Sequence, residues 1–148
     1  MHINPQEASV MAAPFTGGCA CGAIRYECSA EPLIIGNCHC RDCQRSSGAA
    51  FSTGVVVPST SLTLTQGTPK YYMVLADSGN TARRGFCNEC GSPLFADSSA
   101  TPHLIAIKVG SIDDPNWCKP TVDIWTQNAQ PWDYMNPELP KVPTQRQR

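Results

Sequence analysis

The sequence has few charged residues and no long hydrophobic run. Only 16% of its 148 residues are charged, and the formal net charge at pH 7 is -1. Nucleic-acid-binding proteins usually carry a basic stripe, and proteins that bind a membrane surface usually carry a basic amphipathic helix. Neither pattern occurs in this chain. We therefore expect no nucleic-acid partner and no membrane partner.

Several motifs of targeting and catalysis are also missing. In the first eighteen residues the longest apolar run, Val10 to Ala13, ends at Pro14, whereas a signal peptide needs about 7 to 15 apolar residues and a membrane span about 20. We therefore expect a cytoplasmic protein. The sequence contains no phosphate-binding loop, no dinucleotide-binding glycine pattern and no Ser-His-Asp order with supporting motifs. These absences argue against phosphoryl and hydride transfer.

Cysteine, proline and glycine are abundant by contrast. A chain in a reducing compartment uses its cysteines as thiolate ligands more often than as disulfides, and this one has nine. Its thirteen prolines and eleven glycines are spread along the chain. They disfavour a helical bundle, because a proline inside a helix costs about 3 kcal/mol. We predict one mainly β, loop-rich domain whose core is helped by metal.

The densest group of cysteines is Cys38, Cys40 and Cys43. Three thiols this close together are typical of a zinc site. No further cysteine or histidine follows at ligand spacing, and the next cysteine, Cys87, has an evident partner in Cys90. Structural zinc usually has four protein ligands, whereas catalytic zinc has three and one exchangeable position. We interpret the group as a three-thiolate zinc site with one open position.

Two further cysteine pairs each provide half of a zinc site. They are Cys19 with Cys21, and Cys87 with Cys90 in a Cys-x-x-Cys-Gly turn of the kind found in zinc ribbons. The simplest assignment joins the two pairs into one closed four-thiolate site. Spacing alone leaves a second pairing open, in which the three cysteines of residues 38–43 share one of these pairs. A further cysteine, Cys28, shares the apolar face of an expected strand with Ile24 and Tyr26, so we place it in the core.

Three motifs in this order have a recognisable family likeness. They are Gly17-Gly18-Cys19-Ala20-Cys21-Gly22, Cys38-His39-Cys40-Arg41-Asp42-Cys43 and Gly85-Phe86-Cys87-Asn88-Glu89-Cys90-Gly91. Together they resemble the GFA family, the glutathione-dependent formaldehyde-activating enzymes and their relatives. The likeness runs from about Thr16 to Trp132.

This resemblance implies a fold, a ligand set and an activity. The implied fold is mainly β, with small antiparallel sheets stapled by zinc in a β-tent arrangement, over residues 16–136 between tails at 1–15 and 137–148. The implied cofactor is two zinc ions per chain. A structural zinc would be held by Cys19, Cys21, Cys87 and Cys90, and a catalytic zinc by Cys38, Cys40 and Cys43. The implied activity joins formaldehyde to the thiol of glutathione or reverses that step.

Residues near the catalytic group are candidates for substrate handling. Arg41 and Arg45 could bind the carboxylates of a glutathione-like substrate, or they could be solvated surface residues. His39 could move a proton near the metal. On an extended chain, however, it points away from Cys38 and Cys40, so a structural hydrogen bond is the competing interpretation. Two later residues could also enter the open position: His103 and Cys118.

We therefore predict a zinc-dependent carbon–sulfur lyase. Its substrate would be the adduct of a glutathione-like thiol with a small aldehyde such as formaldehyde. Two alternatives belong to other functional classes. One is a non-catalytic, zinc-stapled binding module in which both metals are structural, and the other is a thiol or metal sensor. The sequence indicates no oligomeric state.

Overall fold

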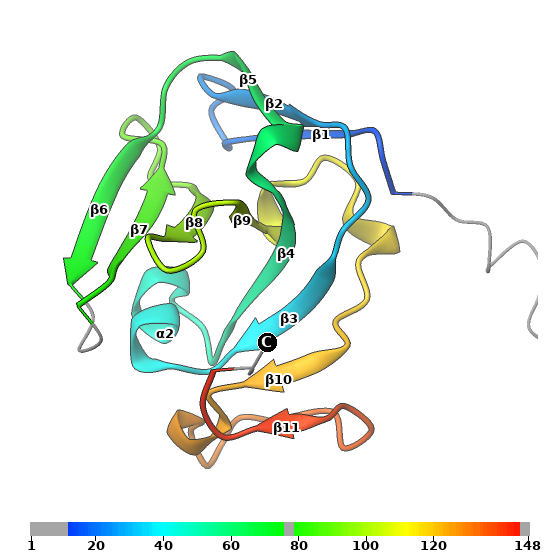
Figure 1. The fold of residues 1–148 in the computed structure, drawn as a ribbon, viewed down its shortest axis with the longest axis vertical. Helices are drawn as coiled ribbons and strands as arrows, with labels where there is room; N and C mark the ends of the chain where they lie inside the picture. Colours follow the sequence, from blue (N-terminus) through cyan, green and yellow to red (C-terminus); the bar gives the residue numbers. More distant parts are fainter. Residues whose placement is uncertain (1–11, 76–78, 146–148) are drawn as a thin grey trace, which may run out of the picture.

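The computed structural model describes residues 12–75 and 79–145, and strands dominate this part of the chain (Figure 1). A three-stranded antiparallel sheet has the order β1-β2-β5. Its strands are β1 (Phe15–Gly18), β2 (Arg25–Cys28) and β5 (Leu62–Gln66). In Figure 1 this sheet lies across the top of the molecule.

The larger sheet has eight strands in the order β11-β10-β3-β4-β9-β8-β7-β6. Their bounds are β3 (Ile34–Cys38), β4 (Ser52–Pro58), β6 (Lys70–Leu75), β7 (Thr81–Phe86), β8 (Pro93–Ser98), β9 (Leu104–Lys108), β10 (Val122–Ile124) and β11 (Lys141–Val142). Neighbours from β3 to β6 pair antiparallel, while β10 pairs parallel with both β3 and β11. The predicted mainly β, antiparallel fold is confirmed, with most strands gathered in one large sheet.

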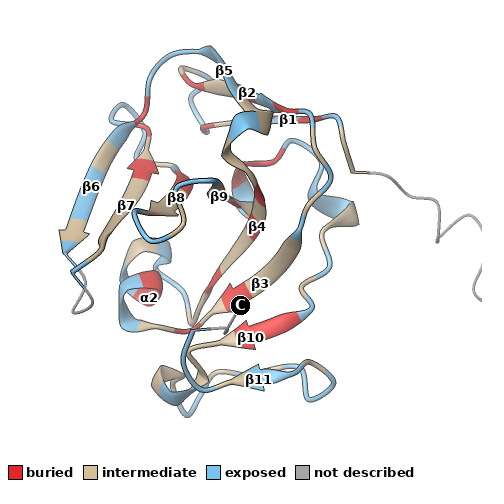
Figure 2. Cartoon of the chain, in the orientation of Figure 1, coloured by how far each residue is buried: buried red, intermediate tan, exposed pale blue. Residues whose placement is uncertain are grey.

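The core lies between the two sheets, and strand β2 shows how the sequence builds it. Successive residues of a strand point to opposite faces, so Tyr26 and Cys28 turn inward and are 1% and 0% exposed. Figure 2 shows buried segments in strands of both sheets. The Tyr26 ring packs edge-on against Phe95 at 5.1 Å between centroids, and its hydroxyl lies 2.6 Å from Ser111 Oγ. Gly17 of β1 lets the backbone pass this hydroxyl, because a Cβ there would lie 2.2 Å from Tyr26 Oη. The prediction that Cys28 is a core residue is confirmed.

A short helix, α2 (Arg41–Ser47), follows β3. The thiol of Cys40 caps its first turn, with the Cys43 amide donating to Cys40 Sγ at 3.3 Å. Gly48 ends the helix in the left-handed region at φ 69°, where glycine has no Cβ penalty. Four single 3-10 turns complete the described elements: η1 (Ser59–Ser61), η2 (Val109–Ser111), η3 (Pro115–Trp117) and η4 (Thr126–Asn128).

The C-terminal segment differs from the tail that the sequence suggested for residues 137–148. Strand β11 pairs with β10, placing Asp123 opposite Lys141 and Ile124 opposite Val142. Strand β11 therefore extends the large sheet, because it supplies partners for the outer backbone groups of β10. Within the described ranges, no helix is long and apolar enough to span a bilayer.

Candidate metal centres and the pocket between them

The first cysteine cluster joins Cys19 and Cys21, which follow β1, to Cys87 and Cys90, which follow β7. All four sulfurs lie within 4.8 Å of one another. Cys19 Sγ is 3.6 Å from Cys21 Sγ, which is 3.8 Å from Cys87 Sγ. Tetrahedral zinc with bonds of about 2.3 Å to sulfur separates its ligands by about 3.8 Å. The four sulfurs thus fit a closed tetrahedral metal site.

Neutral groups make the hydrogen bonds to the sulfurs of this first cluster from outside it. The Ile24 amide donates to Cys19 Sγ at 3.2 Å, and Ser92 Oγ lies 3.1 Å from Cys90 Sγ. Hydrogen bonds from the hydroxyl and the backbone of Ser92 lower the pKa of Cys90 to about 5. Cys19 and Cys87 are buried, whereas Cys21 and Cys90 are exposed. The cluster therefore sits at the surface and clamps the start of the domain to the turn after β7.

The second cluster contains Cys38 at the end of β3, Cys40 at the helix cap and Cys43 in α2. Their sulfurs also lie within 4.8 Å of one another. Among the residues that the structure describes, no further Cys, His, Asp or Glu side chain joins this group. Three converging thiols fit a metal site with one position left for another ligand. The structure thus brings together the seven cysteines predicted as ligands, in the grouping that the family resemblance implied.

Two cations face the second cluster, and the sequence did not single out either of them. Arg84 of β7 places Nη1 and Nη2 each 3.8 Å from Cys43 Sγ, and Nη1 lies 3.3 Å from Ser46 Oγ. Lys108 at the end of β9 is half-buried and donates to Ser52 Oγ at 2.9 Å. Ser52 of β4 pairs with Cys38 of β3. The hydrogen bond to Ser52 therefore places Lys108 of β9 close to the cluster.

The charges of this cluster act on one another. Hydrogen bonds from the Cys38 and Cys40 thiols lower the pKa of Cys43 well below its usual range, and Lys108 and Arg84 add to the effect. Burial lowers the pKa of Lys108, although the neighbouring cysteines, Cys43 first, favour its charged form. Cationic neighbours stabilise thiolates, the form of cysteine that binds metals. Cys43 is therefore prepared to hold negative charge, whereas its hydrogen bond with Cys40 raises the pKa of Cys38.

The candidate arginines of the helix lie elsewhere. Arg41 and Arg45 are exposed on α2, and Arg41 donates to the side chain of Gln44. Their predicted contact with substrate stays a prediction. They are close to the cysteines in sequence, but the helix turns their side chains toward solvent, while Arg84 and Lys108 arrive from other strands of the sheet.

The two further candidates for the open position lie outside both clusters. Strand β4 runs from Ser52, paired with Cys38, to Pro58, paired with Leu104. His103 therefore sits at the end of β4 that is far from the cysteines, and it is exposed. Cys118 packs against the apolar core, and burial raises its pKa to about 11. Neither residue belongs to a metal-ligand group.

His39 is fully buried, and both of its ring nitrogens face carboxylates. Nε2 lies 2.9 Å from Asp123 Oδ1, and Nδ1 lies 2.6 Å from Asp133 Oδ2. Both carboxylate side chains are only 2% exposed. A ring held at both nitrogens inside the protein has no free atom with which to meet a substrate. These contacts favour the structural interpretation of His39.

Asp123 connects this histidine to a larger polar network. Burial would raise the pKa of Asp123, but the contacts with His39, Lys141 and Asn37 outweigh burial and lower it. Lys141 Nζ lies 2.9 Å from Asp123 Oδ2, as an ion pair rather than a directed hydrogen bond. The network ties the backbone between Cys38 and Cys40 to β10 and β11. The network therefore holds the backbone of the second cluster in place from the side of the buried His39 ring.

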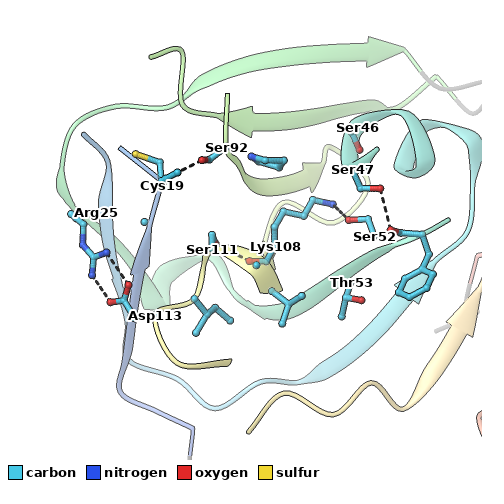
Figure 3. A pocket seen from close by; sticks show the side chains of 17 residues that line it. Cys19, Arg25, Ser46, Ser47, Ser52, Thr53, Ser92, Lys108, Ser111 and Asp113 are labelled. Carbon is cyan, nitrogen blue, oxygen red and sulfur yellow. Dashed lines mark hydrogen bonds and ion pairs between the residues drawn. The ribbon is translucent and has the colours of Figure 1, made fainter. Parts of the chain in front are cut away.

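A pocket of about 590 Å³ is lined by Cys19 of the first cluster and by Lys108, which interacts electrostatically with the second cluster (Figure 3). One end is formed by Ser46 and Ser47 of α2, and the other by the ion pair of Arg25 and Asp113. In Figure 3, Lys108 extends between these ends toward Ser52. Pockets of roughly 300 to 1,000 Å³ hold small-molecule ligands. Because Ser46 and Ser52 contact Arg84 and Lys108, the pocket adjoins the second cluster.

Comparison with known proteins agrees with these observations. Residues 14–128 match the family model described as glutathione-dependent formaldehyde-activating enzyme, GFA. A relative from Sordaria macrospora, provisionally named as such an enzyme, is 34% identical over 96 residues, covering 61% of this chain and 40% of that protein. A relative of the same provisional name from Penicillium rubens is 34% identical over 86 residues, covering 55% and 44%. The chain thus spans less than half the length of these relatives.

A solved structure has the same fold. The crystal structure of a Rhodobacter sphaeroides protein superposes with a TM-score of 0.56 at 19% sequence identity. The match covers 86% of this chain and 99% of that one. At this identity the likeness concerns the fold alone.

Proposed function

The chain belongs to the GFA family, the glutathione-dependent formaldehyde-activating enzymes, and from this premise we propose that it is a zinc-dependent carbon–sulfur lyase. Its substrate is the adduct of a glutathione-like thiol with a small aldehyde such as formaldehyde. One observation carries the proposal. Cys38, Cys40 and Cys43 converge without a fourth ligand among the described residues, next to two cations and a pocket.

The charges around the second cluster favour an anionic fourth ligand. Three thiolates and one Zn²⁺ carry one net negative charge, while Arg84 and Lys108 together supply two positive charges. Adding one more thiolate brings the metal group to two negative charges, which the two cations balance. A neutral ligand such as water would leave one of these half-buried positive charges without a counterpart, which is unfavourable. The site is thus matched to a substrate sulfur.

The reaction requires little from the protein beyond binding and charge stabilisation. In the synthetic direction the thiol sulfur forms a bond to the aldehyde carbon, the carbonyl π bond breaks, and the thiol proton ends on the oxygen. Bound zinc would lower the pKa of the thiol and stabilise the thiolate that leaves in the reverse direction. The Lys108 ammonium points along the pocket and can donate a hydrogen bond to the aldehyde oxygen as negative charge develops there.

The first cluster has a different role in this proposal. Cys19, Cys21, Cys87 and Cys90 hold a structural zinc, which brings the content to two zinc ions per chain. Four protein ligands leave no position for a substrate, and structural zinc contributes directly to folding. A cytoplasmic location remains a prediction from the sequence, as do the domain bounds of 16–136, although strand β11 lies beyond residue 136.

Turnover of a defined adduct tests the function. Zinc-loaded protein should accelerate the breakdown of S-hydroxymethylglutathione, and Cys40→Ser should lose this activity while it keeps the fold and about one zinc per chain. Cys28→Ala is the control, because Cys28 is a thiol outside both clusters. Wild-type protein with two zinc ions and no turnover of any thiol–aldehyde adduct would contradict the lyase and favour a binding module or sensor.

A further inference from the structure

The pocket end farther from the second cluster contains an ion pair that the proposed chemistry does not use. Arg25 Nη1 lies 2.9 Å from Asp113 Oδ1, Nη2 contacts Asp113 Oδ2, and Thr16 Oγ1 donates to the same oxygen at 2.6 Å. The side chains of Arg25 and Asp113 are 35% and 45% exposed. This ion pair is therefore open to a ligand in the pocket.

Both members of the pair retain unused hydrogen-bonding capacity. A guanidinium has five N–H donors, and this contact engages one on each terminal nitrogen. A carboxylate has about four acceptor positions, and Asp113 Oδ1 receives only the Arg25 contact among the described side chains. One side of the pair offers donors and the other offers acceptors. The pair carries no net charge, so it suits a ligand group that bears both charges rather than a simple anion.

A second ion pair of the same kind shows what a purely structural arrangement looks like. Arg83 and Asp97 also form a two-point contact, with Arg83 Nε 2.8 Å and Nη2 2.5 Å from the two carboxylate oxygens. Its guanidinium is stacked over the Tyr71 ring at 4.5 Å, and neither residue lines the pocket. The Arg25–Asp113 pair differs because it forms a pocket wall.

The two ends of the pocket therefore have different chemistry. At one end lie Lys108, Ser52 and Ser46 beside the cysteines, and Lys108 has no carboxylate partner among the residues the structure describes. At the other end lie Arg25 and Asp113, and hydroxyl groups such as those of Ser111 and Thr53 line the space between (Figure 3). A ligand that spans the pocket needs a sulfur at one end and a dipolar group at the other.

We propose that this pocket binds the thiol substrate through a free α-amino acid head, with the α-ammonium on Asp113 and the α-carboxylate on Arg25. The inference rests on the proposed function, because the ligand's sulfur must reach the second cluster. A γ-glutamyl peptide thiol has this composition, since its amide bond uses the side-chain carboxyl and leaves the α-ammonium and α-carboxylate free. The selected substrate class is thus a thiol with a zwitterionic end, and simple alkyl thiols are excluded.

The test compares two ligands that differ only in the ammonium group. Glutathione and N-acetylglutathione are titrated calorimetrically into the zinc-loaded full chain. Because acetylation removes a charged contact at a half-exposed site, we expect it to weaken binding to wild type by about five- to tenfold. In Asp113→Asn, glutathione should bind more weakly and the ratio between the two ligands should fall to about twofold or less. The matched control Asp97→Asn should keep the wild-type ratio.

Each outcome decides between the two proposals. One contrary outcome is that wild type binds both peptides equally, and another is that Asp113→Asn and Asp97→Asn show the same ratio of the two affinities. Either result would mean that the Arg25–Asp113 pair does not bind the amino acid head. The proposed function would then still stand. If neither peptide binds any variant, the proposed function fails and this inference falls with it. Should Asp113→Asn not fold, the ratio measured with wild type alone decides the inference.

Discussion

The two cysteine clusters use the same ligand atom in opposite surroundings. The first has four sulfurs, two of them exposed, and its hydrogen bonds come from neutral amide and hydroxyl groups. The second has three sulfurs, sits deeper, and faces the guanidinium of Arg84 and the ammonium of Lys108. A site with four protein ligands binds no further ligand and so needs no nearby cations to attract one. A site with three protein ligands can use nearby cations to attract an anionic fourth ligand. The difference teaches that the surroundings, more than the ligand type, separate a structural from a reactive metal centre.

The clusters also differ in what holds their backbone in place. In the first, little besides the metal ligands connects the turn after β1 to the turn after β7, although the Ala20 amide donates to Ser92 Oγ at 3.0 Å. In the second, His39, Asp123 and Asp133 fix the segment between Cys38 and Cys40 from the protein interior. The second cluster should therefore tolerate loss of its metal far better than the first.

Breaking the first cluster should have the largest effect. Cys87→Ser should give aggregated or molten protein, because Cys87 is fully buried and structural zinc supplies about 10 kcal/mol or more of folding free energy. Thermal unfolding and zinc content measure the result. A Cys87→Ser variant that melts cooperatively with its zinc content unchanged would contradict the structural role.

Removing the support behind the second cluster should have the next largest effect. His39→Ala leaves Asp123 and Asp133 as buried carboxylates without their shared partner, which should cost about 3–5 kcal/mol of unfolding free energy. Chemical denaturation measures that loss, and His103→Ala is the control because His103 is exposed. If His39→Ala keeps its stability and loses turnover alone, the histidine is a proton carrier and the structural interpretation is wrong.

Changing the charge at the second cluster should affect binding more than folding. Lys108→Met removes one of the two cations and should weaken glutathione binding about tenfold, the usual size of one lost charge-assisted contact. Lys119→Met is the matched control, since Lys119 is exposed and lies away from both clusters. Equal binding by both variants would show that the charge balance does not select the fourth ligand.

The helix arginines should have the smallest effect. Arg41→Ala and Arg45→Ala each remove an exposed charge, and single exposed charges contribute about 0–1 kcal/mol. We expect glutathione affinity and turnover within about twofold of wild type, measured beside Lys108→Met. A tenfold loss in either variant would move substrate recognition from the sheet to the helix surface.

Local features were predictable from the sequence, and long-range contacts were not. Alternation identified Tyr26 and Cys28 as core residues. The assignment of the seven cysteines to two metal sites was implied by the family resemblance, which rests on three cysteine motifs. These features depend on neighbours in sequence, where period and spacing carry the information.

The charges around the second cluster left only a faint signal. Lys108 ends an otherwise apolar strand, and Asp123 interrupts another, which are unusual places for charge in a buried sheet. Neither pattern says what the charge faces, because strand order in the sheet decides that. The same limit explains β11, since its two residues form a strand only by pairing with β10.

The visible spectrum of cobalt-substituted protein tests the central claim, that one cluster is closed and the other open. Glutathione should change the spectrum of wild-type protein as its sulfur enters the fourth position of the second cluster. Cys40→Ser should abolish that change while the spectrum of the four-thiolate first cluster and the cooperative melt persist. If glutathione leaves the wild-type spectrum unchanged and Cys40→Ser does not fold, both clusters are structural. That result would contradict the claim that the second cluster is open.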